Sequence, residues 1–567
     1  MSFHPSRANV FARCALLLLT LAVLAAPARA AVSKTSDDDV VRYADQLFSQ
    51  TYPAGEPGAA VLVTRGGKVL LRKGYGMANL ELGVPIRPDM VFELGSVTKQ
   101  FTAAAILLLQ ERGKLSVSDE VTKYLPDYPT HGQKITIEHL LTHVSGVPNY
   151  TSLPEWRPRV REEMTVQQVI DLFKDKPLDF NPGEKWSYSN SAYILLGAVI
   201  EKASGKTYED FIEQEIFAPL GMKHSYYGHQ NEVVPGRVSG YDKGENGYTI
   251  AEYLSMTQPY SAGSLMSTVD DLALWADALS SEKLLKKASL AQMATPAKLS
   301  SGMSTKYAYG QGISDADGPE IIEHSGGIFG FATDLLRIPD QHLLVVVLSN
   351  NPGKEPSPET LAYHVALKAL GKPWEERKAI ALDPAALDEY VGVYRVDPQT
   401  IRTILREGDK LFSQRSGGDK HEILAASRDD FFYTDVDNRI HFRRDAQGKI
   451  TGMDFLNRFG PDATAAKTDE APPAERQAVQ VDPNLYDDYA GVYELFPGFQ
   501  LTLTREGDHL MVQGTGQPKI EVFPESETRF FLKVVDAEIE LQRGPDGKAT
   551  GLTLLQGGQT IPGKRVK

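Results

Sequence analysis

Residues 92–102 read Phe92-Glu93-Leu94-Gly95-Ser96-Val97-Thr98-Lys99-Gln100-Phe101-Thr102 and begin an apolar run that continues to Leu109. Ser96 and Lys99 are three residues apart, a spacing that places two side chains on one helix face. A serine hydroxyl becomes an effective nucleophile when a base takes its proton, and a lysine can be that base when burial lowers its pKa. The stretch therefore predicts a helix with a nucleophile and its base in the first turn.

The same Ser-x-x-Lys spacing occurs again at Ser280-Ser281-Glu282-Lys283. There we expect a solvated helix end, so the pattern alone does not identify a catalytic serine. The evidence must come from the motifs that accompany Ser96.

Three further motifs follow along the chain. Trp186-Ser187-Tyr188-Ser189-Asn190 contains a Tyr-x-Asn, and His324-Ser325-Gly326-Gly327 contains a His-x-Gly before the apolar Ile328-Phe329-Gly330-Phe331. Thr142-His143-Val144-Ser145-Gly146 follows the helix-like run Ile137-Glu138-His139-Leu140-Leu141.

These motifs, in this order, resemble those of the serine β-lactamase and penicillin-binding superfamily, in its class C-like branch. The resemblance covers about residues 40–370. It implies an α/β (α+β) domain with an antiparallel sheet flanked by helices, and a nucleophile at a helix N-terminus.

The resemblance also implies roles for the motif residues. Ser96 would attack a carbonyl to form an acyl-enzyme, and Lys99 would share its proton. Tyr188, kept partly ionised, would pass a proton to the leaving group, and Asn190 would orient Lys99. Whether Lys99 or Tyr188 is the general base stays open.

The oxyanion hole would consist of the backbone N–H groups of Ser96 and Gly327, with Gly326 beside them in the substrate-binding segment. His324 is expected to be a catalytic residue. It stands where many β-lactamases and transpeptidases carry the lysine of Lys-Thr-Gly, and its presence weakens the case for a fixed cation that binds a substrate carboxylate.

Charges near His324 bear on the substrate. No Lys or Arg occurs from Tyr307 to Thr333, whereas four acidic residues lie just before His324: Asp315, Asp317, Glu320 and Glu323. An acidic approach favours a substrate with a free amine, although these residues also fit a solvated turn. We expect a serine hydrolase that cleaves amide bonds of small D-amino-acid peptides or amides, as bacterial D-aminopeptidase does.

Other functions remain open. A β-lactamase, a D-Ala-D-Ala carboxypeptidase or a carboxylesterase of the same superfamily is the nearer alternative, and a non-catalytic sensor or binding protein on this fold is the alternative of another class. We find no Gly-x-Ser-x-Gly motif of an ordinary α/β-hydrolase. His139 and His143 have the spacing of metal ligands, but no third ligand suggests itself, so we expect His143 to be structural and the protein to need neither metal nor cofactor.

The N-terminal residues predict a secretory signal peptide over residues 1–30. Arg7 and Arg13 precede the apolar segment Ala15 to Ala26, and Ala28-Arg29-Ala30 has the small-x-small pattern of a cleavage site. We therefore expect a periplasmic or secreted protein without a membrane anchor after cleavage. The one cysteine, Cys14, lies inside this segment, so we expect no disulfide.

The acidic composition restricts the partners. The 567 residues include 60 Lys and Arg against 74 Asp and Glu, a formal net charge of −14. Such a charge argues against nucleic acid or anionic lipid. The expected partner is a small-molecule or short-peptide substrate, with a homodimer possible.

The C-terminal third contains an internal repeat with a shift of about 99 residues. The segment 387–394 recurs at 486–493, and Arg406-Glu407-Gly408-Asp409 recurs at Arg505-Glu506-Gly507-Asp508. Short alternating runs broken by Gly-Asp turns predict two small antiparallel barrels, which resemble the two lipocalin-like modules of bacterial D-aminopeptidase.

The predicted domains are residues 31–378, 379–470 and 480–567, and the Ala-rich stretch Ala463 to Ala478 is predicted to be a linker. In the first domain, Gly58 to Leu71 predicts a β-hairpin around Gly66-Gly67. A loop from one barrel is expected either to limit substrate size at Ser96 or to serve only stability or dimer contact. In the first case, deletion of residues 480–567 would broaden the range of substrate lengths.

Overall fold

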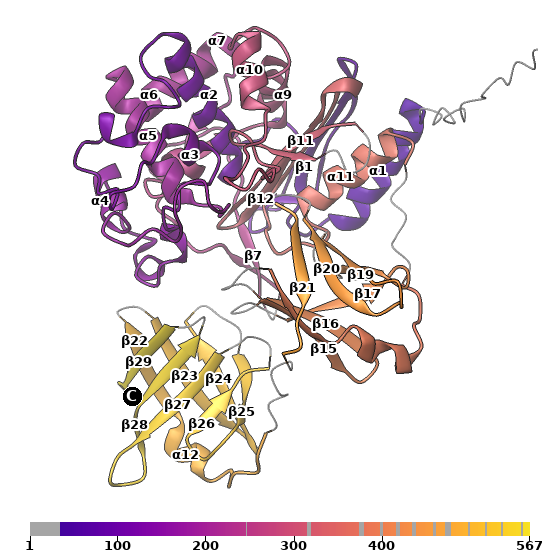
Figure 1. The fold of residues 1–567 in the computed structure, drawn as a ribbon. Coiled ribbons are helices and arrows are strands. Elements are labelled where there is room, and N and C mark those ends of the chain that lie inside the picture. The colour runs from indigo at the N-terminus through magenta and orange to yellow at the C-terminus, as the bar shows by residue number, and fades with distance from the viewer. Residues whose placement is uncertain are drawn as a thin grey trace, which may run out of the picture.

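The computed structural model describes one mixed α and β domain followed by two β-barrels (Figure 1). The described residues are 35–244, 247–314, 319–372, 379–396, 401–415, 420–433, 438–457, 461–470, 478–496, 499–515, 519–533, 537–556 and 559–567. The predicted signal peptide and the acidic residues Asp315 and Asp317 lie outside them.

A six-stranded antiparallel sheet forms the centre of the first domain, in the order β10-β11-β12-β13-β1-β2. Its strands are β1 (Ala59–Arg65), β2 (Lys68–Tyr75), β10 (Gly312–Ser314), β11 (Ile321–Ile328), β12 (Phe331–Ile338) and β13 (Leu343–Ser349). Strands from both ends of the domain therefore pair with one another. This confirms the predicted antiparallel sheet.

The hairpin between β1 and β2 is also confirmed. Gly66 and Gly67 both have positive φ, +59° and +77°. A two-residue turn with positive φ at both positions matches the twist of the strands it joins, and only residues such as glycine adopt it without strain.

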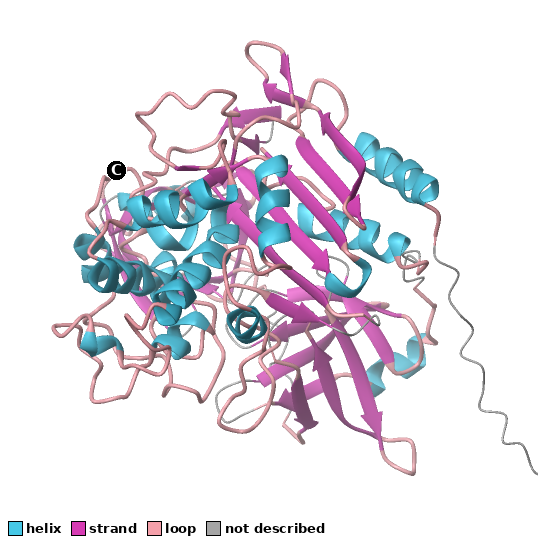
Figure 2. Ribbon diagram, turned by 90° about the horizontal axis from the view of Figure 1, so that it is seen from above, coloured by secondary structure: helices cyan, strands magenta, loops and turns pink. Residues whose placement is uncertain are grey.

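Alternate residues of β1 belong to two different hydrophobic cores. Ala60 and Leu62 face the core of the helical region, whereas Val61 and Val63 face the core beneath α1 (Asp37–Thr51) and α11 (Pro358–Ala369). Figure 2 shows helices on both faces of the sheet. Both faces are therefore buried, which explains the nearly continuous apolar sequence of β1 and β13.

The helix predicted from the opening stretch is α2 (Thr98–Glu111), which is buried on all sides as far as Leu109. Phe101 stacks on Trp275 of α9 (Val269–Ala278), with ring centroids 4.0 Å apart. The remaining helices of this region are α3 (Ile137–Leu141), α4 (Val166–Asp171), α5 (Asn190–Ser204), α6 (Tyr208–Ile212), α7 (Ala218–Leu220), α8 (Tyr260–Gly263) and α10 (Lys287–Met293). Short strands connect them: β3 (Met77–Asn79), β4 (Val84–Pro85), β5 (Phe92–Glu93), β6 (Tyr226–Tyr227), β7 (Tyr241–Gly244), β8 (Gly247–Ile250) and β9 (Leu265–Ser267).

The second Ser-x-x-Lys lies just after α9, as a solvated helix end. The exposed Lys283 pairs with Asp277 at 2.5 Å, and Ser280 Oγ donates to the carbonyl of Ala276 at 3.1 Å. Its lysine therefore contacts a carboxylate, and the prediction for this motif is confirmed.

Each repeat forms a closed antiparallel barrel of eight strands, as predicted. The first contains β14 (Gly392–Arg395), β15 (Ile401–Glu407), β16 (Lys410–Arg415), β17 (Lys420–Ala425), β18 (Asp430–Tyr433), β19 (Arg439–Arg444), β20 (Ile450–Leu456) and β21 (Ala463–Lys467). The second contains β22 (Gly491–Phe496), β23 (Phe499–Glu506), β24 (His509–Gly514), β25 (Lys519–Pro524), β26 (Arg529–Phe531), β27 (Ala537–Arg543), β28 (Ala549–Gln556) and β29 (Gln559–Arg565).

The linker prediction is wrong over residues 463–467. These residues form β21, which pairs with both β20 and β14 and closes the first barrel. Without it, two strand edges would be left unpaired, and this pairing outweighs the weak strand propensity of alanine. Residues 471–477 of the predicted linker lie outside the described ranges.

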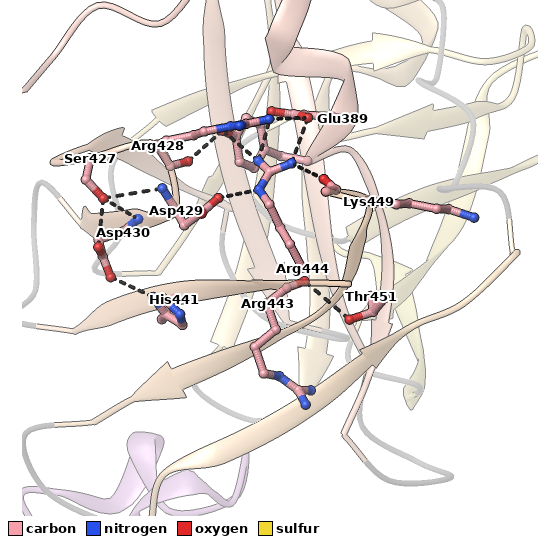
Figure 3. Close-up of polar contacts among 12 residues, drawn as sticks. Glu389, Ser427, Arg428, Asp429, Asp430, His441, Arg443, Arg444, Lys449 and Thr451 are labelled. Carbon is pink, nitrogen blue, oxygen red and sulfur yellow. Dashed lines mark hydrogen bonds and ion pairs between the residues drawn. The ribbon is translucent and has the colours of Figure 1, made fainter. Parts of the chain in front are cut away.

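Arg444 stabilises one end of the first barrel (Figure 3). Its guanidinium donates to both carboxylate oxygens of Glu389, at 2.8 and 2.9 Å, and to Asp429 at 2.6 Å. These bonds join β19 to the 3₁₀ helix Pro384–Glu389 that precedes the barrel. Lys306 of the first domain contacts the same barrel, with Nζ 2.6 Å from Asp462.

Candidate active site

Ser96 lies at a cleft of 520 Å³ in the first domain. It belongs to the 3₁₀ turn Gly95–Val97, which leads directly into α2. The cleft is lined by Gly95, Ser96, Tyr150, Thr151, Trp156, Arg157, Asn190, Asp242, Glu252, Leu254, Pro259, Ala262, Gly263, Gly327, Ile328, Phe329 and Pro352. All of these residues belong to the first domain.

Two glycines allow β11 to pack directly on the turn that carries Ser96. Gly95 has a φ of +54°, and a Cβ on it would lie 3.0 Å from the backbone nitrogen of Gly327. A Cβ on Gly326 would lie 2.0 Å from the carbonyl oxygen of Leu94. This contact places the Gly327 backbone beside Gly95 and Ser96 at the cleft, as an oxyanion hole made by these two backbones requires.

Lys99 is completely buried beneath Ser96. Its Nζ lies 3.0 Å from Ser96 Oγ, 2.8 Å from Asn190 Oδ1 and 2.9 Å from the carbonyl oxygen of Ala262. Burial lowers the pKa of Lys99 well below its usual value.

The three contacts of Lys99 match the needs of a neutral amine. A neutral amine has two N–H donors, which Asn190 Oδ1 and the Ala262 carbonyl accept, and one lone pair, which then faces the hydroxyl of Ser96. In this form Ser96 donates to Nζ, which is the arrangement of a nucleophile and its base.

Tyr188 lies near the same serine. Burial raises the pKa of Tyr188 above its usual value, whereas the Ser96 hydroxyl acts to lower the pKa of Tyr188. Lys99 Nζ lies over the Tyr188 ring, 4.8 Å from its centroid, and not beside the hydroxyl. The expected partial ionisation of Tyr188 is therefore wrong, because desolvation of the phenolate outweighs any nearby positive charge.

Asn190 begins α5, directly after the N-cap residue Ser189. Its Nδ2 donates to Thr151 Oγ1 at 3.2 Å, which leaves Oδ1 as the acceptor for Lys99. The hydrogen bonds therefore define the orientation of the amide.

His324 lies on β11 beneath the cleft and not in its lining. Its Nδ1 lies 2.6 Å from the Ser325 carbonyl, and its Nε2 lies 2.8 Å from the Tyr307 hydroxyl. Burial, together with the nearby Lys99, lowers the pKa of His324 to about 3. The structure therefore holds a neutral imidazole near Tyr188 and engages both ring nitrogens inside the protein.

Tyr307 joins His324 to His143. Ser189 N–H donates to His143 Nδ1 at 3.1 Å, so His143 carries its proton on Nε2 and donates it to the Tyr307 hydroxyl at 3.2 Å. Tyr307 in turn donates to His324. The His143 ring also packs against Tyr188, with centroids 4.3 Å apart. Sequence reasoning missed Tyr307, because it lies in none of the four motifs.

The spacing of His139 and His143 does not produce a metal site here. Thr136 N–H donates to His139 Nδ1 at 3.4 Å in a helix cap, whereas His143 is buried beneath Tyr188. Within the described ranges, no three His, Cys, Asp or Glu side chains are grouped to hold a metal ion.

The charged residues of the cleft are Arg157, Asp242 and Glu252. Arg157 pairs with Glu252, and its guanidinium also lies 4.7 Å from the Phe329 ring centroid. For Asp242 on β7, no ion pair with another described residue is recorded. Glu323, by contrast, is buried away from the cleft. The negative charge at the cleft therefore comes from Asp242 on β7 and from Glu252, which follows β8.

Comparison with known proteins agrees with this geometry. The family model described as Beta-lactamase matches residues 44–370, more than half of the chain. The chain belongs to the beta-lactamase family. A model described as a domain of unknown function, DUF3471, matches residues 376–469 and 475–565, which cover the two barrels.

Members and structural neighbours of this family include penicillin-binding proteins. Penicillin-binding protein 4* of Bacillus subtilis is 29% identical over 427 residues, which cover 71% of this chain and 93% of that protein. An octameric penicillin-binding protein homologue from Pyrococcus abyssi has a TM-score of 0.53 at 24% identity and covers 75% of this chain and 99% of its own. The D-amino acid amidase of Ochrobactrum anthropi SV3 has a TM-score of 0.51 at 23% identity and covers 59% of this chain and 99% of its own. Family membership and the Ser96 site make this protein a serine hydrolase.

Proposed function

We propose that this hydrolase cleaves the amide bond of small D-amino-acid amides or peptides that carry a free amine, through an acyl-enzyme on Ser96. The main support for this chemistry is that Lys99 is buried next to Ser96 among uncharged groups, which favours the neutral amine. The preference for an amine rests on Asp242, the cleft carboxylate without a recorded ion pair among the described residues.

Acylation begins when neutral Lys99 takes the proton of Ser96 and Oγ attacks the substrate carbonyl. The backbone N–H groups of Ser96 and Gly327 stabilise the oxyanion. Tyr188, whose raised pKa keeps it protonated, gives its proton to the leaving nitrogen. The new Lys99 ammonium returns a proton to the tyrosinate, so the site regains its starting protonation when the amine leaves.

Deacylation uses the same groups in the opposite direction. A water molecule attacks the acyl carbon and its proton passes to Lys99, after which Ser96 Oγ leaves and takes that proton from Lys99, which becomes neutral again. Asn190 holds the amine of Lys99 in place through both steps. His324, His143 and Tyr307 act as positioning residues, since their rings pack near Tyr188 and the ring nitrogens of both histidines are hydrogen-bonded inside the protein.

The shape of the cleft suits a small substrate with an apolar side chain. Trp156 and Phe329 pack edge to face at 6.4 Å, beside Ile328 and Leu254, and form an apolar wall. Asp242 lies in the same lining and supplies a negative charge for an ammonium. The fold of the D-amino acid amidase, which acts on such compounds by its name, supports this substrate class.

A β-lactamase or D-Ala-D-Ala carboxypeptidase binds a substrate carboxylate, for which the cleft offers one cation, Arg157, already paired with Glu252. For this reason we rank both activities behind the amidase. A carboxylesterase is the second candidate, because the apolar wall and the Ser96 machinery serve an ester equally well.

A substrate panel on one preparation tests the proposal. It contains D-alanine p-nitroanilide, its L-enantiomer, its N-acetyl derivative, p-nitrophenyl butyrate, a chromogenic cephalosporin and a peptide ending in D-Ala-D-Ala. We expect the highest kcat/KM for the free-amine D-anilide and a loss of at least tenfold on N-acetylation or inversion. Equal rates with the N-acetyl compound, or a higher kcat/KM for the cephalosporin, would refute the amine-directed assignment.

We also propose that the protein is exported and forms a homodimer. The Arg-flanked apolar segment and small-x-small motif of residues 1–30 support export, and comparing the extracytoplasmic fraction of cells that express the full chain or a deletion of residues 1–30 tests it. No helix in the described part of the chain is long and apolar enough to span a membrane. The octameric relative is an example of assembly in a neighbour of this fold, and light scattering on the purified protein measures the state here.

A further inference from the structure

The second barrel opens into a cavity of 410 Å³ that it shares with a loop of the first domain, and most of the barrel residues that line the cavity are apolar. Among its lining residues are Phe499, Leu501, Val512, Leu532, Ile539 and Leu554. A volume of this size is within the range of small-molecule sites in proteins. The mouth of the cavity faces residues 151–154 and Arg157 of the first domain.

The first barrel carries different side chains at the positions that line this cavity. The strands of the two barrels pair in the same register when the residue numbers are shifted by 99. Arg402, which pairs with Arg415, therefore corresponds to Leu501, which pairs with Gly514. By the same shift, Ser413, Tyr433 and Phe455 correspond to Val512, Leu532 and Leu554.

These corresponding side chains contact one another in the first barrel, where Ser413, Tyr433 and Phe455 are buried. Arg402 donates to Ser413 Oγ at 3.1 Å and to the Tyr433 hydroxyl at 2.8 Å. Its guanidinium lies 3.9 Å from the centroid of the Phe455 ring. The second barrel replaces this whole group with aliphatic side chains, which cannot make the polar contacts.

An empty apolar cavity is unfavourable, because the atoms that line it lack dispersion partners on one side. An apolar ligand would supply those partners. In Figure 1, α12 (Leu485–Tyr489) lies at the end of the second barrel that is away from the first domain. Its Tyr486 and Tyr489 belong to the barrel core and close that end. A ligand therefore enters from the end that faces the first domain.

The mouth of the barrel adjoins the Ser96 cleft. Thr151 and Arg157 line both the barrel cavity and the cleft. In the described part of the chain, Arg157 is the one charged side chain in the lining of the barrel cavity. The cavity thus offers an apolar interior and a polar mouth that carries the Arg157 and Glu252 pair.

We propose that the second barrel binds the unbranched alkyl chain of an amphiphile, with the polar head of that molecule at the mouth of the cavity, beside the ion pair of Arg157 and Glu252. The alkyl chain belongs either to the acyl group that Ser96 cleaves or to a separate ligand. In both cases the apolar lining of the barrel binds the same alkyl group. Since binding in the lumen needs no catalysis, this site stands apart from the function proposed above.

Isothermal titration of sodium dodecanoate, below its critical micelle concentration, into the full chain with Ser96→Ala measures the binding directly. The decisive variant copies these side chains of the first barrel into the second, with Leu501→Arg, Val512→Ser, Leu532→Tyr and Leu554→Phe. We expect at least a tenfold loss of affinity. Thr502→Arg, a change outside the apolar lining on the same strand, is the matched control and should bind as the parent does.

Leu554→Phe alone narrows the lumen with one conservative change, and serves if the fourfold variant does not fold. It should weaken dodecanoate binding in a protein with unchanged circular dichroism. Absence of dodecanoate binding by the parent chain, or equal affinity in a folded variant with a filled lumen, would overturn the proposal.

With Ser96 intact, p-nitrophenyl butyrate and p-nitrophenyl dodecanoate distinguish the two sources of the chain. If the alkyl chain is part of the substrate, the variant with the filled lumen has a lower kcat/KM for the dodecanoate ester. Its kcat/KM for the butyrate ester is unchanged. If the ligand is separate, the ratio of the two esters does not change while dodecanoate binding is lost. Both results support the site and assign its ligand.

Discussion

Lys99 Nζ lies 3.0 Å from Ser96 Oγ, and its two other hydrogen-bond partners, Asn190 Oδ1 and the Ala262 carbonyl, are uncharged. A buried amine without a carboxylate partner is held in its neutral form. Lys99 is therefore able to accept the proton of Ser96 before a substrate binds.

The first prediction concerns the pH dependence of acylation. Because the pKa of Lys99 is lowered, its neutral fraction should rise with pH and reach a plateau well below the usual lysine value of about 10.4. The rate of labelling by a fluorophosphonate, measured from pH 5 to 10, should follow that curve. A rate that still rises tenfold per pH unit up to pH 10 would exclude Lys99 as the base.

The second prediction compares the two Ser-x-x-Lys motifs. Ser96→Ala should abolish fluorophosphonate labelling, and Lys99→Met should slow acylation by roughly 10³-fold or more, as expected when a member of a nucleophile and base pair is removed. Ser280→Ala and Lys283→Met are matched controls, since Lys283 contacts Asp277 at the surface. Labelling that survives in Ser96→Ala would contradict the assignment of the nucleophile.

The third prediction concerns Tyr307. Tyr307→Phe removes the hydroxyl that joins His143 to His324 and leaves two buried ring nitrogens without that partner. The free energy of unfolding should fall by about 1–3 kcal/mol, and kcat for a reporter ester should fall because Tyr188 loses its support. Tyr124→Phe removes a tyrosine hydroxyl bonded to Asp119 away from Tyr188, and should leave kcat unchanged. Unchanged kcat in Tyr307→Phe would show that this chain of contacts is purely structural.

The fourth prediction concerns acid stability. The pKa of His324 is lowered to about 3 in the folded protein, against about 6.5 when unfolded. Between these values the unfolded chain binds the extra proton, so stability is full above pH 6.5 and falls as pH decreases towards 3. The slope for one such proton is at most about 1.4 kcal/mol per pH unit. Urea unfolding between pH 7 and 5 should show a shallower pH dependence in His324→Asn, and an identical slope would refute this linkage.

The fifth prediction concerns Asp242. Asp242→Asn removes the negative charge proposed to bind the substrate ammonium, so KM for D-alanine p-nitroanilide should rise about tenfold or more, with kcat little changed. KM for p-nitrophenyl butyrate should be unaffected. Lys243→Gln, a neighbouring surface change, is the control. Equal effects on the ester and the anilide would assign Asp242 a structural role.

Local sequence determined the elements that need only neighbouring residues. The apolar run after Ser96 predicts α2, Gly66-Gly67 predicts the hairpin, and the 99-residue repeat predicts two barrels, since each depends on periodicity or turn chemistry within a short segment. The linker prediction over residues 463–467 failed because the pairing of β21 with β14 and β20 is long-range.

The sequence by itself determined the family, the nucleophile candidate and the barrel count, because spacing within one helix or one repeat carries that information. Only the tertiary structure decided that Tyr307 joins two histidines, that Asp242 reaches the cleft, and that the second barrel lines a cavity where the first has the contacts of Arg402. These features join residues far apart in the chain. Packing brings such residues together, and packing depends on the whole set of side chains in a core rather than on any local pattern.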